Sequence, residues 1–312
     1  MQVIKGVACL KNPLKGSVVT IGNFDGVHLG HQKLILTAIE QAKKLQVPSV
    51  VMTFDPHPLK FLFPEKKLKR IFSISDQIEC FEKLGVDYVV FEPFSRELSQ
   101  LTPELFIQDK IRAPFHPQSL VVGYDFSFGK GRSGSAEALK SKSKEQGFAV
   151  QIVQAFLFKG EVVSSTRIRS AIEAGDVELA KELLGRPFYL EGLVERGDGR
   201  GAVLGFPTAN INSHSEMFPK FGVYCTRVFW QNREYDAVTN VGLIPTFIKT
   251  PEAKPRVESY IFDFSQMIYG EKIKVSFHHF LREEKKFSSK EDLQNQINSD
   301  VLIAKEWFKK HG

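Results

Sequence analysis

The chain has 312 residues, of which 42% are hydrophobic and 25% charged, with a formal net charge of +6. These values are those of an ordinary soluble protein long enough for two domains. No stretch is apolar enough to span a bilayer, and Met1–Gly6 lacks the apolar core of a signal peptide. Cys9, Cys80 and Cys225 are widely separated, which predicts reduced thiols. We therefore expect a cytoplasmic protein without a membrane partner.

The positive charge raises the possibility of a nucleic-acid partner, because phosphate backbones attract clustered Lys and Arg. Basic residues are instead interleaved with acids, as in Glu65–Arg70 and Arg282–Lys286, which is typical of a solvated face. A modest surplus also steers anionic nucleotides. We expect no nucleic-acid partner and keep one only as a distant alternative.

A strand is predicted at Ser17–Ile21 and a helix at Gln32–Leu45. Glycines and histidines lie between them, at Gly22, Gly26, His28, Gly30 and His31. Glycines let the backbone turn sharply and approach a ligand. A helix that follows such a turn offers N–H groups to phosphate, and imidazoles add donors. The segment predicts a site that holds a nucleoside triphosphate and stabilises charge during attack on a phosphoryl group.

Up to about Leu184, apolar strand-like runs alternate with helical patterns. The predicted strands are Ser49–Phe54, Tyr88–Phe91, Leu120–Val122 and Val150–Val153, and the predicted helices include Ile74–Leu84, Pro103–Ile111 and Val177–Leu184. This alternation predicts an α/β, Rossmann-like domain in which helices cover a parallel sheet. Ligands of such sheets bind at the carboxyl ends of the strands.

Two further motifs of this half contain basic residues. Gly129–Gly134 satisfies GxGxxG, but it lies six residues after Leu120–Val122, and no acidic residue ends Val150–Val153. We predict a mobile basic loop near phosphate rather than a dinucleotide site. Ser164–Arg169 combines hydroxyl residues with arginines at a helix start, which makes either a second anion site or an ordinary N-cap with a solvent-facing Arg. The chain has no GxxxxGK[ST] motif, so a kinase activity here would not use a P-loop.

From Tyr189 the pattern changes to short strands separated by Gly, Pro and Asn. The predicted strands are Leu190–Val194, Gly222–Trp230, Ala237–Gly242, Arg256–Phe262 and Ile273–Phe280, and a helix follows at Lys290–Lys309. This pattern is typical of a small antiparallel barrel. The predicted helix Val177–Leu184 ends at Gly185, a residue typical of helix C-termini, so Gly185–Pro187 is the natural linker. We therefore predict domains at residues 1–184 and 185–312.

The string GNFDGVHLGHQ, at residues 22–32, contains HxGH, and Thr53–Pro58 reads TFDPHP. Together they resemble the bacterial bifunctional riboflavin kinase/FMN adenylyltransferases, or FAD synthetases. The resemblance implies a nucleotidyltransferase domain in which His28 and His31 are catalytic. The phosphate-binding residues it implies are Gly22, Asn23, Phe24, Asp25, Gly30, Ser165, Thr166 and Arg169. It also implies flavin binding by His57, Asp125, Phe126 and Phe128, although two Phe residues two apart are more often core.

The second half resembles the riboflavin kinase of the same family. Gly197–Gly201 matches its glycine loop and Pro207–Asn210 its PTAN sequence, in which Thr208 and Asn210 are hard ligands suited to Mg²⁺. Matching downstream segments are Phe221–Tyr224, Thr239–Gly242, Pro245–Phe247, Val257–Ile261 and Phe280–Arg282. The resemblance implies nucleotide binding by Gly201, flavin binding near Arg282, and Glu258 as the base. In the family this segment usually reads VExH, and Tyr260 stands here in place of the His. The ordinary alternative for Glu258 is a strand glutamate that faces solvent and has no catalytic role.

These resemblances imply phosphorylation of riboflavin to FMN in the C-terminal barrel and adenylylation of FMN to FAD in the N-terminal domain. Both steps would use ATP with Mg²⁺, and no obligate protein partner is implied. An adenylyltransferase for another phosphate substrate, such as nicotinamide mononucleotide or phosphopantetheine, leaves the PTAN half unexplained. A flavin-binding regulator without chemistry is the non-enzymatic alternative. His278 and His279, adjacent on a strand, point to opposite faces and predict no shared metal.

Overall fold

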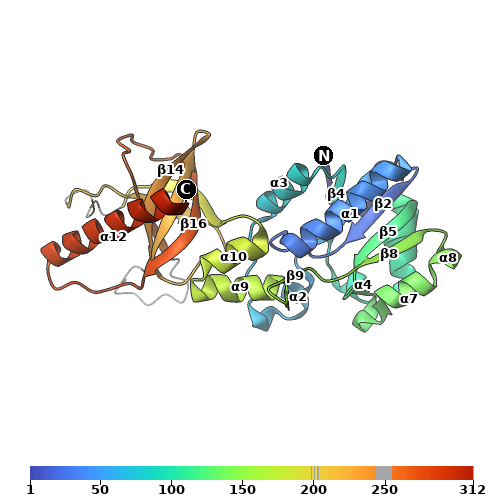
Figure 1. Ribbon diagram of the computed structural model, residues 1–312. Coiled ribbons are helices and arrows are strands. Elements are labelled where there is room, and N and C mark those ends of the chain that lie inside the picture. Colours follow the sequence, from blue (N-terminus) through green and yellow to red (C-terminus); the bar gives the residue numbers. More distant parts are fainter. Residues whose placement is uncertain (198, 200, 202–203, 244–254, 312) are drawn as a thin grey trace. The chain divides into compact units, whose positions relative to one another are not determined.

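The computed structural model describes residues 1–197, 199, 201, 204–243 and 255–311 (Figure 1). The side chains of residues 144 and 146 are outside this description. The chain forms two compact units, Met1–Ser165 and Thr166–Gly312. No disulfide links the cysteines, and among the described helices none has the length and apolarity needed to cross a membrane.

The first unit contains a six-stranded parallel sheet in the order β1-β4-β3-β2-β5-β8. Its strands are β1 (Gln2–Ile4), β2 (Ser17–Ile21), β3 (Ser49–Asp55), β4 (Tyr88–Pro93), β5 (Pro117–Gly123) and β8 (Ala149–Val153). Successive residues of β2 face opposite cores, since Val18 and Val19 belong to different buried clusters. The predicted Rossmann-like fold is confirmed. Sequence reasoning missed β1, which has only three residues and one buried side chain.

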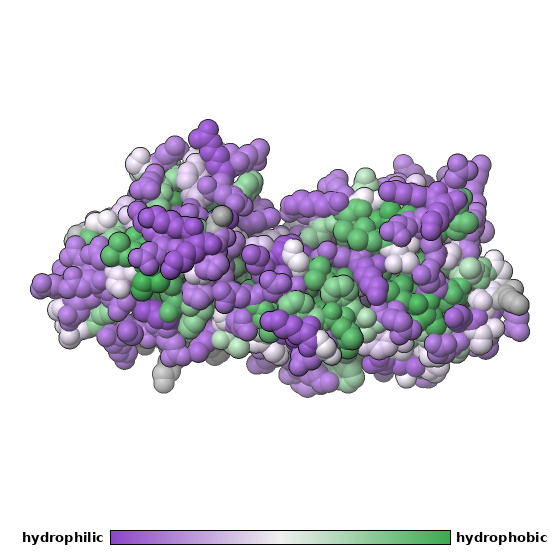
Figure 2. Space-filling view, in the orientation of Figure 1, coloured by the Kyte–Doolittle hydropathy of each residue, from purple (hydrophilic) through white to green (hydrophobic). Residues whose placement is uncertain are grey.

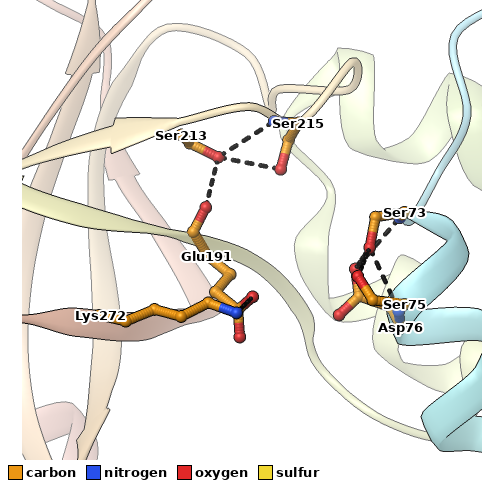
Figure 3. Close-up of polar contacts among 7 residues, drawn as sticks. All are labelled: Ser73, Ser75, Asp76, Glu191, Ser213, Ser215 and Lys272. Atoms are coloured by element: carbon orange, nitrogen blue, oxygen red, sulfur yellow. Dashed lines mark hydrogen bonds and ion pairs between the residues drawn. The ribbon is translucent and has the colours of Figure 1, made fainter.

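Helices cover both faces of this sheet. They are α1 (Leu29–Leu45), α2 (Pro58–Leu62), α3 (Ile74–Leu84), α4 (Arg96–Ser99), α5 (Pro103–Phe106), α6 (Ala113–Phe115), α7 (Ala136–Ser141) and α8 (Ser143–Gln146). The helix predicted at Pro103–Ile111 is α5 followed by a π-helical turn at Ile107–Arg112, which keeps Ile107 and Ile111 buried. Ser73 and Asp76 form a capping box that fixes the start of α3 (Figure 3).

The GxGxxG segment is not a strand-to-helix turn. It forms the tip of a hairpin between β6 (Ser127–Phe128) and β7 (Gly134–Ser135), where Arg132 Nε donates to Ser127 Oγ at 2.7 Å. This geometry agrees with the expectation that it is no dinucleotide site. A second small hairpin joins β9 (Leu157–Phe158) and β10 (Glu161–Val162).

The second unit is a closed antiparallel barrel in the order β11-β12-β15-β14-β13-β16, preceded by two helices and followed by a third. Its elements are α9 (Ser165–Ala174), α10 (Val177–Leu184), β11 (Phe188–Glu195), β12 (Ala209–Ser213), β13 (Gly222–Trp230), β14 (Arg233–Gly242), β15 (Arg256–Ile261), β16 (Lys272–Arg282) and α12 (Lys290–His311). The predicted barrel and terminal helix are confirmed. Sequence reasoning did not assign β12, whose polar residues pair only through the closed sheet.

Hydroxyl groups fill part of the barrel interior. Thr226 Oγ1, Thr239 Oγ1 and Ser259 Oγ form a buried chain with separations of 2.6 and 2.7 Å. Near the barrel edge, Ser213 Oγ donates to the carbonyl of Glu191 at 2.8 Å (Figure 3). These contacts satisfy polar groups that β-strands bring into the interior.

The boundary between the compact units falls after Ser165, the first residue of α9, whereas the sequence predicted a domain boundary at Gly185–Pro187. Residues 166–184 pack with the barrel, since the Lys220 N–H donates to the Ile172 carbonyl at 3.1 Å. His279 Nδ1 also lies 3.0 Å from Glu178 Oε1. The functional boundary therefore stays a prediction.

Candidate active sites

The HxGH segment joins β2 to α1 through a turn with left-handed backbone at Phe24, Gly26 and Val27, whose φ angles are 49°, 82° and 40°. Left-handed conformation is costly for Phe and more so for β-branched Val. The burial of both side chains, each at most 1% exposed, offsets this cost. The turn is thus held by packing rather than by glycine freedom alone.

Contacts from other segments fix this turn. Asp25 Oδ1 accepts from the Ile71 N–H at 3.1 Å, and the Asp25 carbonyl accepts from Ser165 Oγ at 2.9 Å. Thr53 Oγ1 donates to the Asn23 carbonyl at 3.1 Å. Two of the predicted phosphate-binding residues, Asp25 and Ser165, are therefore in direct contact. Asp25 is buried and bonds the turn, so its structural role is visible here and its role toward phosphate stays a prediction.

The two histidines lie against each other at the start of α1. Their ring centroids are 3.5 Å apart with an interplanar angle of 18°. His28 is the N-cap residue, and its Nδ1 accepts from the His31 N–H at 3.3 Å. Because Nδ1 accepts, neutral His28 carries its proton on Nε2. The helix thus begins inside HxGH, three residues before the predicted start at Gln32.

His31 has an unusual environment for a titratable ring. Burial, together with nearby His28, holds its pKa well below the ordinary 6.5. Its Nδ1 is buried without a hydrogen-bond partner. A buried polar atom without a protein partner is uncommon, which marks this ring as a departure from ordinary core packing. His31 is therefore neutral at pH 7 and suited to hydrogen bonding.

Gly30 is required by the His28 ring. A Cβ at Gly30 would lie 3.2 Å from His28 Cε1 and 3.3 Å from Nδ1. A side chain here would force the imidazole to shift by a few tenths of an ångström. The glycine predicted to bind phosphate thus also keeps the ring in place.

The predicted flavin-binding residues have different environments. His57 is buried and caps α2, with Nδ1 accepting from the Leu59 N–H at 3.1 Å. Asp125 is exposed. Phe126 and Phe128 stack on each other at 5.1 Å between centroids, and Phe128 is buried in the core. Flavin binding by these residues stays a prediction, and core packing is the role visible for Phe128.

Apolar side chains lie exposed around α2. Figure 2 shows a mainly hydrophilic face interrupted by hydrophobic patches. The exposed large apolar residues of this stretch are Leu59, Phe61, Leu62 and Phe63. The Phe61 ring contacts Phe94 edge to face at 5.6 Å. An apolar surface thus follows His57 directly in the chain.

Thr166 and Arg169 lie on α9, in the second compact unit. Ile168 and Ala171 are the buried residues of this part of the helix. The triphosphate-binding role of Thr166 and Arg169 stays a prediction.

In the barrel, strand pairing places three of the predicted kinase residues, Asn210, Glu258 and Arg282, in one row. The row is defined by successive cross-strand partners: Glu195, Asn210, Glu258, Asn240, Val223 and Arg282. Its members come from segments far apart in the sequence. Because alternate residues of β15, such as Val257 and Ser259, are fully buried, the row lies on the outer face of the barrel.

Arg256 links two members of this row. Its Nε lies 3.1 Å from Asn210 Oδ1 and 2.8 Å from Glu258 Oε1. The Glu258 side chain is 28% exposed, so its carboxylate is accessible to a substrate hydroxyl. A Cβ at Gly197 would lie 2.2 Å from Asn210 Nδ2, so only glycine leaves room for this amide. The predicted base and metal ligand are therefore neighbours.

Thr208 and Gly201 meet at the same loop. A Cβ at Gly201 would lie 3.4 Å from Thr208 Oγ1 and 2.4 Å from the Phe206 carbonyl. The Phe206 N–H donates to the Gly201 carbonyl at 2.8 Å. Asp198, Arg200 and Pro245–Phe247, which also match the family, lie outside the described residues.

The donor set of this loop fits Mg²⁺. The Thr208 hydroxyl and the Asn210 amide oxygen are hard oxygen donors. The Glu258 carboxylate and the Asn210 amide oxygen both contact Arg256 Nε. Within the described part of the chain, no cluster of three or more His, Cys, Asp or Glu could hold a metal by itself. A magnesium ion here would therefore depend on nucleotide phosphates and water for its other ligands.

Arg282 forms a buried ion pair with the terminal helix. Its guanidinium makes bidentate contact with Asp300, with Nε–Oδ1 at 2.9 Å and Nη2–Oδ2 at 2.7 Å. Asp300 is 3% exposed and also accepts from Gln296. Arg282 thus anchors α12 to the barrel, and flavin binding by it stays a prediction.

Tyr260, at the position of the family's usual His, packs its ring edge to face against Phe206 at 5.2 Å. Tyr260 and Phe206 thus join β15 to the loop that precedes Thr208. The prediction that His278 and His279 point to opposite faces is wrong, since both rings lie against Trp307 of α12, at 6.1 and 5.7 Å between centroids. The pairing of β16 with β13 is irregular here: Cys225 pairs with His279 but Thr226 with Phe277, so the strict alternation of side chains is lost.

Sequence reasoning missed three side chains that support these sites: Gln77, Arg256 and Asp300. Each lies on a regular helix or strand without a motif of its own. Only the fold brings each next to a predicted site residue. The one usable signal was the spacing of Arg256, two residues before Glu258 on the same strand face.

Two family models match this chain in the predicted order. The FAD synthetase model matches residues 10–167, and the riboflavin kinase model matches residues 184–308. The chain is also similar to a crystal structure described as a macrolide-efflux protein from Streptococcus pneumoniae. That likeness has 34% identity, a TM-score of 0.89 and 98% coverage of both chains.

Several full-length relatives carry both names together. A bifunctional riboflavin kinase/FMN adenylyltransferase of Haemophilus influenzae is 37% identical, with 99% of each chain covered. Those of Escherichia coli K12 and Bacillus subtilis 168 are each 36% identical, covering 99% and 96% of this chain and 98% and 95% of their own. The chain, with its HxGH turn on a parallel sheet and its PTAN segment on a six-stranded barrel, belongs to the bifunctional riboflavin kinase/FMN adenylyltransferase family.

Proposed function

We propose that this chain phosphorylates riboflavin with ATP to give FMN and then adenylylates FMN with a second ATP to give FAD and pyrophosphate. The observation that supports this most is that each compact unit brings together residues predicted for one of the two reactions: the His28–His31 pair in one and the Asn210–Glu258 pair in the other. We propose residues 1–184 and 185–312 as the functional domains, working in the cytoplasm.

In the adenylyl transfer, an FMN phosphate oxygen attacks the α-phosphorus of ATP and the bond to the β-phosphate oxygen breaks. No protein nucleophile is needed. Neutral His31 and the Nε2–H of His28 hydrogen-bond phosphate oxygens as charge develops, and the N–H groups at the start of α1 add to this. Ser165, Thr166 and Arg169 bind the triphosphate in this proposal. The exposed apolar stretch after His57 is suited to the flavin ring.

In the kinase step, the terminal ribityl hydroxyl attacks the γ-phosphorus of ATP and ADP leaves. Glu258 accepts the hydroxyl proton, since its carboxylate is partly exposed on the outer face of the barrel. Thr208 and Asn210 would hold Mg²⁺, which when bound neutralises charge on the phosphates. Gly201, which has no side chain, lets the backbone of its loop approach the nucleotide. Arg282 holds α12 against the end of β16 through Asp300.

One incubation tests the whole proposal. The protein is supplied with riboflavin, ATP and magnesium, and FMN and FAD are separated by chromatography over time. We expect FMN first and FAD later, with FAD also formed from added FMN. Binding of flavin without either product would favour a regulator, and adenylylation of nicotinamide mononucleotide or phosphopantetheine in place of FMN would favour a different transferase.

A further inference from the structure

Gln77 on α3 contacts the HxGH turn through a single amide nitrogen. Its Nε2 donates to the carbonyl of Asn23 at 3.0 Å and to the carbonyl of Phe24 at 3.0 Å. An amide nitrogen has two N–H groups, so each carbonyl receives one of them. The side chain is 8% exposed, which makes these bonds hard for water to replace.

These two carbonyls flank Phe24, one of the two left-handed residues of the turn that are not glycine. Phe24 has a φ of 49°. Its backbone conformation sets the direction of the following residues, which bring His28 to the N-cap of α1. The Phe24 carbonyl also accepts from the Val27 N–H at 3.0 Å, which closes the turn from inside. Gln77 is the side chain that fixes two successive peptide groups here from a different element.

The start of α3 is itself held in place, so Gln77 is a fixed support. The capping box of Ser73 and Asp76 sets the helix start, and the Ile71 N–H just before it bonds Asp25. The segment from Ile71 to Gln77 therefore contacts three consecutive residues of the turn. Residues of catalytic sites need such support, because small displacements of reacting groups cost large factors in rate.

We propose that Gln77 is a positioning residue for the adenylyl transfer, which holds the turn so that His28, His31 and the N–H groups of α1 face the ATP phosphates. This inference rests on the proposed function of the first unit. The inference predicts that residue 77 must donate hydrogen bonds to the Asn23 and Phe24 carbonyls. Glutamate has the same shape but only acceptors, so it would face two carbonyl oxygens with like charge. Lysine differs in shape but supplies N–H donors.

The test compares Gln77→Glu, Gln77→Leu and Gln77→Lys in the full chain. The control is Glu82→Leu, an exposed position of the same helix. The measurements are kcat and KM for ATP during FAD formation from added FMN, together with the thermal unfolding temperature. We expect the Glu and Leu variants to lose about 10- to 100-fold in kcat/KM through both lower kcat and higher KM. The Lys variant should lose less than the Leu variant, because it keeps N–H donors although burial of its charge has a cost.

Thermal unfolding separates positioning from simple loss of folded protein. A purely structural role would lower the unfolding temperature and the active fraction but leave the KM for ATP unchanged. Wild-type kinetics in the Glu and Leu variants, an unchanged KM, or equal losses for Lys and Leu would overturn the proposal. Absence of FAD formation by the wild-type chain would instead refute the proposed function, so the two failures are distinguishable.

Discussion

The two candidate sites are built in opposite ways. The catalytic part of the candidate adenylyl-transfer site is one continuous segment, residues 22–31, bent by left-handed residues and held by contacts from other segments. The kinase site comes from separate strands that register places in one row. The first site is thus readable as a motif, while the second depends on pairing. A substitution within the HxGH turn should therefore impair FAD formation. A substitution of a residue in the barrel row, or of a residue that holds the row in place, should impair the kinase unit.

The largest effect is expected for Glu258→Gln, which keeps the side-chain shape but removes the base. Riboflavin phosphorylation should slow by roughly 10² to 10⁴, the usual contribution of a general base. Conversion of added FMN to FAD should stay unchanged. The measurement is FMN and FAD formation in parallel assays, with the exposed Glu234→Gln on β14 as control. An unchanged kinase rate would assign the base to another residue.

Asp300→Ala should destabilise the barrel unit, because it leaves the largely buried Arg282 guanidinium, whose side chain is 16% exposed, without its bidentate partner. Breaking one side of a buried ion pair costs about 3 to 5 kcal/mol. Chemical denaturation of the full chain, followed by Trp fluorescence, measures this, since both Trp230 and Trp307 lie in the second unit. Glu306→Ala, at an exposed position of α12, serves as control. Equal stability of the two variants would show that the pair adds nothing.

His31→Ala should reduce FAD formation from FMN while riboflavin phosphorylation survives. Removing one donor that stabilises developing charge costs about 2.7 to 4 kcal/mol of transition-state stabilisation. The exposed Glu40→Ala on α1 controls for changes to the helix. Near-normal FAD synthesis by His31→Ala would remove His31 from the catalytic set.

The smallest expected effect is a pH dependence set by His278. Burial, with Arg227 and Lys181 nearby, lowers the pKa of His278 from 6.5 to about 4. Between these values the unfolded chain binds the proton and the folded chain does not, so stability is full above pH 6.5 and falls as the pH drops toward 4. The loss is about 2 to 3 kcal/mol. Denaturation at pH 7 and pH 4.5 should show a smaller difference in His278→Gln than in the wild type; an equal difference would contradict the assignment.

The contrast between a local motif and strand pairing also explains which parts of the fold and of the sites could be predicted from the sequence. The alternation of strands and helices indicated the parallel sheet, and HxGH indicated a phosphate site, because both are local patterns. The helix start at Leu29 was missed, since it depends on His28 acting as cap through a ring nitrogen. Strand β12 was missed because its residues are polar and gain their partners only when the barrel closes.

Side chains that support a site are the hardest part to predict. Gln77 lies on an amphipathic helix where a buried Gln would be read as a helix-face residue, yet its amide bonds a turn 53 and 54 residues away. Arg256 has a nearby sequence signal, but its contact with Asn210 spans 46 residues. Such contacts follow from the fold and have no pattern in the chain itself.

The row on the barrel constrains where chain length can vary. Side chains of a strand alternate between faces, so one residue inserted between Ala237 and Val238 would turn Asn240 inward and bring buried Thr239 to the outside. An insertion at Gln231–Asn232, the two-residue turn between β13 and β14, would leave every pair of the row intact. Natural insertions and deletions in this half should therefore fall at such turns, and peptide tags for labelling the protein belong there as well.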